Sequence, residues 1–267
     1  MTEDDPAVPA PARRAPVRRY GLWFLIPLVA GIAVLCVFSW EWREGLKYQR
    51  ILVDGARFLP VQQLFTLAAV PPTSTLYSID LYDVRARLLT QPFVKSAVIN
   101  RQFPGTLHVN IVERVPIAAV NAGQLWYVDE EGTMLPYLQA PVRLDLPVIS
   151  GCGDFPGIHP GERGDNPQLM EAIGLLQTAQ AIDSSMYHFL SEVNMSSGKD
   201  IILYSTDVGV PIIFGRGDAA KKLLRLQAFW GDFVKSNNAA RLRYVDLRFE
   251  DQVVVKWLND DQQSGKM

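Results

Sequence analysis

Residues 94–113 read VKSAVINRQFPGTLHVNIVE, and this stretch decides the fold of the first half of the chain. Two extended runs, 94–103 and 106–113, flank Pro104-Gly105, a pair typical of the turn in a β-hairpin. Alternate side chains of a strand point to opposite sides. In the second run, one side consists of Leu107, Val109 and Ile111, and the other of His108, Asn110 and Val112. The stretch therefore predicts a hairpin with one face buried.

The residues before this hairpin predict one strand and two helices. Residues 49–53 have the composition of a strand, and apolar positions at helical spacing within 61–68 predict a helix that Pro71-Pro72 stops. Asp80 can cap a second helix, which Pro92 ends. The order β-α-α-β-β predicts a small three-stranded sheet with two helices covering one face.

Behind Ile117 the pattern changes to short strands and turns. The stretch from Pro136 to Pro167 is rich in proline and glycine and is predicted to be mostly loop. Strands are predicted within 118–123, 124–135, 201–204, 208–214, 244–249 and 252–257, and helices after Pro167 and after Asp218. The last two strands predict a terminal hairpin. The pattern indicates an α+β protein in which helices cover a mixed β-sheet.

Residues 20–40, YGLWFLIPLVAGIAVLCVFSW, carry no charge over 21 positions. At about 1.5 Å of helical rise per residue they cover roughly 31 Å, the thickness of a bilayer's hydrocarbon core. This predicts a single transmembrane helix, with Tyr20, Trp23 and Trp40 as its interfacial anchors. A cleaved signal peptide is the rival interpretation. It fits less well, because the apolar core of a signal peptide is usually shorter and ends in small residues.

The charges beside this stretch predict its orientation. Four arginines precede it: Arg13, Arg14, Arg18 and Arg19. Positively charged flanks stay on the cytoplasmic side, so the tail 1–19 is expected in the cytoplasm, and its prolines predict disorder. Residues 41–48 are interpreted as a connector. The rest of the chain is expected outside the cytoplasm.

Composition and motifs argue against several classes of function. A net charge of -2 gives no general reason to bind nucleic acid. Cys36 lies in the apolar stretch and Cys152 is alone beyond it, so no intramolecular disulfide is expected. Cys152 and His159 would supply only two of the four ligands of a structural zinc site. No nucleophile lies beside a histidine in a catalytic pattern. The sequence predicts no enzyme, cofactor, metal site or small-molecule substrate.

Several phrases of the sequence, in their order behind one apolar stretch, carry a family resemblance. They are Val53-x-Gly55, Gln91-Pro92-Phe93-Val94, Arg101-x-Phe103-Pro104-Gly105-Thr106-Leu107, Glu113-Arg114-x-Pro116-Ile117-Ala118, Val128-Asp129-x-x-Gly132 and Tyr244-Val245-Asp246-Leu247-Arg248-Phe249. With them the chain resembles the FtsQ/DivIB cell-division proteins, bitopic membrane proteins of the bacterial septum. The first four phrases resemble the family's POTRA domain and the last two its β domain. An extra acidic residue in the turn Glu130-Glu131 departs from the pattern.

The resemblance implies a non-enzymatic assembly protein of the divisome, in the inner membrane at the septum. It implies a POTRA domain over 49–116, a β domain over 117–258 and a flexible tail over 259–267. The β domain is expected to bind the small coiled-coil proteins FtsB and FtsL, and the POTRA domain to dock other division proteins. In the family, the partner adds a strand to the edge formed by the last strand of the β domain, where backbone groups are unpaired.

By the same resemblance, specific residues at the end of the chain are expected to contact the partner. Phe249, Asp251, Gln252 and Trp257 are the predicted contacts, and Arg248 is a candidate for orienting the partner. From the residues alone, Phe249 and Trp257 could instead be core aromatics of a terminal hairpin. Asp246, two positions from Arg248 on the same strand face, could pair with that arginine.

Lys221, Lys222 and Arg225 are predicted to form an outward basic face on the helix after Asp218. Such a face is either simply solvated or steers acidic positions of the partner. Two other functions compete with divisome assembly. An anchored cell-wall hydrolase would need a catalytic site within 136–167. A chaperone of secretion or outer-membrane assembly would share the POTRA domain but would carry repeats of it and a barrel.

Overall fold

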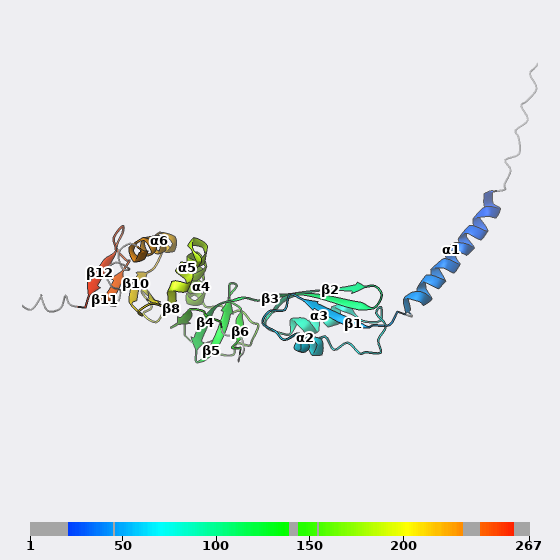
Figure 1. The fold of residues 1–267 in the computed structure, drawn as a ribbon, viewed down its shortest axis with the longest axis horizontal. Helices are drawn as coiled ribbons and strands as arrows, with labels where there is room; N and C mark the ends of the chain where they lie inside the picture. Colours follow the sequence, from blue (N-terminus) through cyan, green and yellow to red (C-terminus); the bar gives the residue numbers. More distant parts are fainter. Residues whose placement is uncertain (1–20, 45, 139–143, 154, 232–240, 259–267) are drawn as a thin grey trace, which may run out of the picture.

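The computed structural model of the protein describes residues 21–44, 46–138, 144–153, 155–231 and 241–258. These residues form an amino-terminal helix, a small three-stranded unit and a larger unit built on a mixed sheet, in chain order (Figure 1). The α+β architecture predicted from the sequence is confirmed. The predicted tails 1–19 and 259–267, and the anchor residue Tyr20, lie outside the described residues.

Helix α1 (Gly21–Glu44) covers nearly all of the uncharged stretch. Its large apolar side chains from Leu25 to Trp40 are exposed. The side chain of the predicted anchor Trp23 lies outside the described part of the structure. Within the described ranges, no helix combines the length and the apolarity that a membrane crossing requires. The helix predicted over residues 20–40 is therefore present from Gly21 onward.

The first sheet has the strand order β1-β3-β2. The elements of this unit are β1 (Arg50–Asp54), α2 (Val61–Ala68), α3 (Leu81–Leu89), β2 (Val94–Gln102) and β3 (Thr106–Glu113). Strand β1 runs parallel to β3, and β2 and β3 form the predicted antiparallel hairpin. The two helices cover one face, where Val84 and Leu88 of α3 join Leu107, Val109 and Ile111 of β3 in one buried cluster. The Asp80 side chain caps α3 by accepting the N–H groups of Tyr82 and Asp83.

Two residues from the quoted phrases hold this first unit together. Gly55 has a φ of 89°, and a Cβ there would lie 1.9 Å from the carbonyl oxygen of Ile111, so only glycine fits. Glu113 is buried, and its carboxylate accepts the backbone N–H groups of residues 57–59 at 2.7 to 3.1 Å. These contacts fix the loop behind β1 against the end of β3.

The second sheet has nine strands among the described residues, in the order β12-β11-β10-β9-β8-β7-β4-β5-β6. The strands are β4 (Pro116–Ala122), β5 (Gln124–Asp129), β6 (Met134–Pro136), β7 (Val148–Ser150), β8 (Leu190–Asn194), β9 (Ile201–Ser205), β10 (Pro211–Gly215), β11 (Leu242–Asp246) and β12 (Val254–Trp257). Parallel pairs β4-β7, β7-β8 and β10-β11 make the sheet mixed. The terminal pair β11-β12 is antiparallel, as predicted.

Helices cover one face of this sheet. They are α4 (Pro167–Ile182), α5 (Ser184–Phe189) and α6 (Ala219–Phe229). Helix α4 has an apolar stripe that is fully buried in the main core, formed by Leu169, Ile173, Leu176 and Ala179. The Asn166 side chain caps α4 by accepting the N–H groups of residues 168 and 169. Asp218, before α6, adopts a left-handed φ of 48° and makes no side-chain cap bond.

The prediction of mostly loop over Pro136–Pro167 is corrected by strand β7, which lies between β4 and β8. This strand has only three residues, so its sequence offers no periodicity, and it exists because parallel neighbours bind it on both sides. Helix α5 and strand β8 were also not predicted. They follow α4 directly, with only Asp183 between the two helices. The sequence pattern thus failed to predict the two strands at the centre of the sheet, β7 and β8.

Candidate partner-binding edge

Strand β12 forms one edge of the nine-stranded sheet, with β11 as its only neighbour among the described strands. Leu258 donates its backbone N–H to the carbonyl of Arg241 at 2.9 Å, on the side of β11. Backbone N–H groups alternate in direction along a strand, so the N–H of Val255, three residues earlier, points to the open side. The edge therefore offers hydrogen-bonding groups to an added strand.

The predicted contact residues lie on this edge and on the turn before it. Phe249 is 50% exposed, so it is not a core aromatic. Trp257 is half-buried and packs against the main core, as the core interpretation of the sequence expects. Asp251 and Gln252 are exposed in the β11-β12 turn. The structure brings the four residues to one end of the sheet, and their role in binding stays a prediction.

Arg248 is held by two aspartates beside the edge. Its guanidinium bonds the Asp246 carboxylate, with Nη2 to Oδ2 at 2.7 Å, and its Nη1 bonds Asp200 Oδ2 at 3.1 Å. The Asp246 bond and charge raise the pKa of Arg248. Burial alone would raise the pKa of Asp246, but the bonds and charge of Arg248 outweigh this and lower it. The suggested pairing is confirmed, and it presents Arg248 in one orientation.

The prediction that Lys222 points outward is wrong. The residue is 7% exposed, and its Nζ donates to the carbonyls of Phe214 at 3.0 Å and Arg216 at 2.7 Å. Burial lowers the pKa of the Lys222 amine. Helical spacing suggested an outward position, but the long side chain turns back to satisfy the carbonyls at the end of β10. Lys222 is therefore not available to a partner.

Lys221 is exposed and Arg225, one helical turn later, is partly buried; both contact the β11-β12 turn. Lys221 Nζ lies 2.8 Å from Asp251 Oδ1, and Arg225 Nη1 donates to the carbonyls of Phe249 at 3.0 Å and Gln252 at 3.4 Å. The hydrogen bond between Lys221 and Asp251 raises the pKa of the amine and lowers that of the carboxylate. These contacts were not predicted from the sequence.

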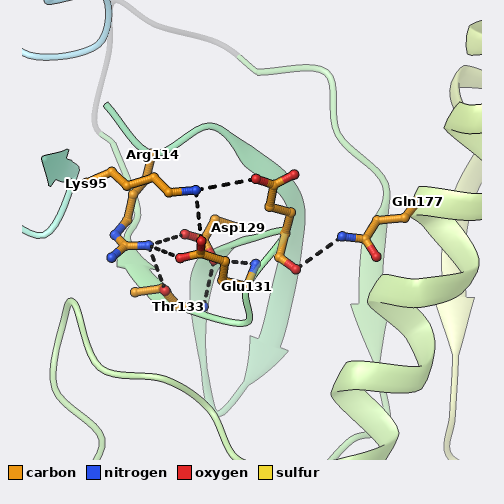
Figure 2. Close-up of polar contacts among 7 residues, drawn as sticks. Lys95, Arg114, Asp129, Glu131, Thr133 and Gln177 are labelled. Carbon is orange, nitrogen blue, oxygen red and sulfur yellow. Dashed lines mark hydrogen bonds and ion pairs between the residues drawn. The ribbon is translucent and has the colours of Figure 1, made fainter. Parts of the chain in front are cut away.

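A second polar cluster lies where the first unit meets the second (Figure 2). Arg114, between β3 and β4, donates from Nη1 to Asp129 Oδ2 at 2.7 Å, Glu131 Oε2 at 2.9 Å and Thr133 Oγ1 at 3.1 Å. Lys95 of β2 lies 2.9 Å from Glu131 Oε1. The two basic residues come from the end of the first unit, and the acceptors from the turn between β5 and β6. The cluster therefore joins the two units.

The acceptor turn is itself rigid. Asp129 Oδ1 accepts the backbone N–H groups of Glu131 at 2.9 Å and Thr133 at 2.8 Å. Gly132 has a φ of 84°, and a Cβ there would lie 2.8 Å from the sulfur of Met170. The Asp129 side chain is 2% exposed, whereas that of Glu131 is 48% exposed. The hydrogen bond from Lys95 lowers the pKa of Glu131 most, and the hydrogen bond from Arg114 lowers it further. Asp129 is thus the buried centre of the junction.

The sequence pattern gives Arg114 and Asp129 no role beyond their places in family phrases, and Glu131 none beyond its place in a turn. No periodicity connects position 114 with position 129, because the contact forms across the junction rather than along one element. Arg114 and Asp129 each stand in a family phrase beside a strand end, but neither phrase indicates that the two residues meet.

A hydrolase would need catalytic groups within the stretch 136–167. Cys152 is buried, and burial raises the pKa of its thiol to about 11. His159 lies at the surface, 3.6 Å from Glu162. Among the residues that the structure describes, no three His, Cys, Asp or Glu side chains gather in a way that could hold a metal ion.

Comparisons with known proteins agree with the geometry. The model of the FtsQ-type POTRA domain matches residues 46–114, and that of the FtsQ/DivIB cell division protein C-terminal region matches residues 118–248. The cell division protein FtsQ of Rhodothermus marinus is 33% identical over 254 residues, which cover 92% of this chain and 90% of that protein. FtsQ of Geobacter sp. (strain M21) is 30% identical over 211 residues, 79% of this chain and 76% of that protein. The chain belongs to the FtsQ/DivIB family of cell division proteins.

Proposed function

We propose that this protein assembles the bacterial divisome by capturing FtsB and FtsL at the edge strand β12. As a member of its family it is a non-enzymatic cell division protein. The observation that carries the proposal is the position of β12 at the end of the sheet, beside a half-exposed Phe249. A partner segment in extended conformation can pair with the open side of β12, while neighbouring side chains select its sequence.

The chemistry around the edge suits a partner with a short strand and acidic side chains. The backbone of β12 supplies affinity without regard to sequence, and Phe249 and Trp257 supply apolar contact area. The side chain of Arg248 is 45% accessible, so it can meet a carboxylate at the rim. These features suit a strand supplied by the FtsB–FtsL pair.

The binding test compares the full chain with its Phe249→Ala and Trp257→Ala variants, using the extracytoplasmic segment of FtsB in complex with FtsL. Each folded variant is expected to lose tenfold or more in affinity, about 1.4 kcal/mol, because each removes an aromatic contact at the edge. Calorimetric titration measures the affinity, and thermal melting checks the fold of each variant. Equal binding by wild type and both folded variants would move the partner site elsewhere.

We further propose that α1 is a single membrane anchor, with the amino terminus in the cytoplasm and the two units in the periplasm at the septum. The support is the uncharged stretch 20–40, the helical conformation of α1 and the exposure of its apolar side chains. Tyr20, Trp23 and Trp40 are the proposed interfacial residues. The POTRA domain is then close to the membrane, where it can dock other division proteins.

The anchor is tested by placing two arginines in α1, as Leu28→Arg with Val34→Arg. Each arginine near the centre of a bilayer costs about 2.5 to 3.5 kcal/mol on insertion scales, so the pair is expected to release most of the protein from the membrane. Alkaline extraction of membranes measures the retained fraction, and Leu28→Ile with Val34→Leu is the matched control. Retention of the arginine variant at the control's level would contradict the anchor.

A further inference from the structure

The turn between β11 and β12 is held by helix α6 through two side chains. Arg225 donates to two carbonyls of the turn, those of Phe249 and Gln252, and Lys221 pairs with Asp251 between them. Asp251 has a φ of 53°, a conformation that residues other than glycine rarely adopt. Contacts on both sides of Asp251 are what keep such a turn in one shape.

Helix α6 is in turn fixed to the sheet. Lys222, next to Lys221 in sequence, bonds the carbonyls of Phe214 and Arg216 at the end of β10. Leu223 and Leu226 of the same helix are fully buried in the main core. A side chain that reaches from α6 to the turn therefore links that turn to the most rigid part of the domain.

We infer that Arg225 and Lys221 are positioning residues for partner capture: they fix the β11-β12 turn, so that Phe249 and the open edge of β12 are held in the shape that a partner binds. This inference rests on the proposed function. It assigns the basic face a role different from steering, because the charges of Lys221 and Arg225 are already directed at the turn. Fixing a binding segment in advance lowers the ordering cost of binding, and such gains are seen mainly in the dissociation rate.

The fold should tolerate loss of the Arg225 side chain. Its Nε is buried without a hydrogen-bond partner among the described residues, so truncation also removes an unsatisfied donor. Arg216→Ala is a matched control, since it removes the same charge from the segment just before α6. Arg216 contacts Glu171 and the carbonyl of Lys199 rather than the β11-β12 turn.

The experiment uses the full chain in lipid nanodiscs and two readouts. Hydrogen exchange of residues 249–257, measured without partner, is expected to be about tenfold faster in Arg225→Ala than in wild type and unchanged in Arg216→Ala. Surface plasmon resonance with the FtsB–FtsL segment is expected to give a dissociation rate about tenfold higher for Arg225→Ala, about 1.4 kcal/mol, with association changed less than twofold. Lys221→Ala is expected to shift both readouts in the same direction by a smaller factor, because its ion pair is exposed.

Unchanged exchange in Arg225→Ala would overturn the inference, whatever happens to the affinity. An association of Arg225→Ala that is slower than that of wild type, by a factor that shrinks at high salt, would overturn it too, and would make Arg225 a steering charge. If wild type fails to bind FtsB–FtsL, the proposed function fails. In that case the exchange readout still decides whether α6 fixes the turn, because it needs no partner.

Discussion

Replacing Val255 by proline is expected to lower the affinity for the FtsB–FtsL segment at least a hundredfold, about 2.7 kcal/mol. The N–H of Val255 points to the open side of β12, as inferred from the bond between Leu258 and Arg241. Proline removes this donor and places its ring where an added strand would lie. The pairing of β12 with β11 does not use this N–H, so the edge tolerates proline better than a central strand would.

The control for this variant is Val255→Ala. Alanine keeps the N–H and removes more of the half-buried side chain than proline does, so it is expected to lose less than tenfold in affinity. Calorimetric titration of both variants separates the backbone from the side-chain contribution, once thermal melting shows that each is folded. A folded proline variant that binds as tightly as the alanine variant would mean that no strand is added at β12.

Replacing Asp129 by alanine is expected to lower the free energy of unfolding by about 3 kcal/mol, because two backbone N–H groups lose their acceptor and Arg114 loses its buried counter-charge. The carboxylate bonds Arg114 through one oxygen and two backbone N–H groups through the other. All of these lose a partner at once. The midpoint of thermal unfolding is expected to fall by about 6 to 12 °C.

Glu131→Ala is the matched variant for Asp129→Ala, because Glu131 contacts the same Arg114 Nη1 from an exposed position. A solvent-exposed ion pair contributes about 0 to 1 kcal/mol, so the midpoint should fall by no more than about 4 °C. Differential scanning calorimetry of the full chain measures both shifts. Equal shifts for the two variants would contradict the view that the burial of Asp129 makes it the centre of the junction.

Local patterns predicted the elements whose side chains interact along the chain. The hairpin around Pro104-Gly105, the cap at Asp80 and the stripe of α4 were all visible, because turn chemistry, capping and helical periodicity act over a few residues. Alternating side chains also predicted the terminal hairpin. The open edge, its partner and its contact residues came instead from the family resemblance.

Sequence patterns failed where residues distant in the chain decide a residue's conformation or contacts. Lys222 occupies a position that helical spacing places outward, yet the carbonyls at the end of β10 bind its amine. Strand β7 has three residues and is a strand only because β4 and β8 bind both of its sides. Arg114 and Asp129 belong to different units, and nothing in either phrase states that the two would meet.

By itself, the sequence determined three features: the helix over the uncharged stretch 20–40, the β-α-α-β-β order of the first unit, and the hairpin that ends the second unit. Each depends on the spacing of residues within one segment. Only the tertiary structure decided that Lys221 and Arg225 hold the β11-β12 turn and that Asp129 lies buried beneath Arg114. The physical reason is that burial and charge pairing depend on surfaces that meet only after folding. The sequence around a charged residue does not show whether that residue will contact water, a partner or another part of its own chain.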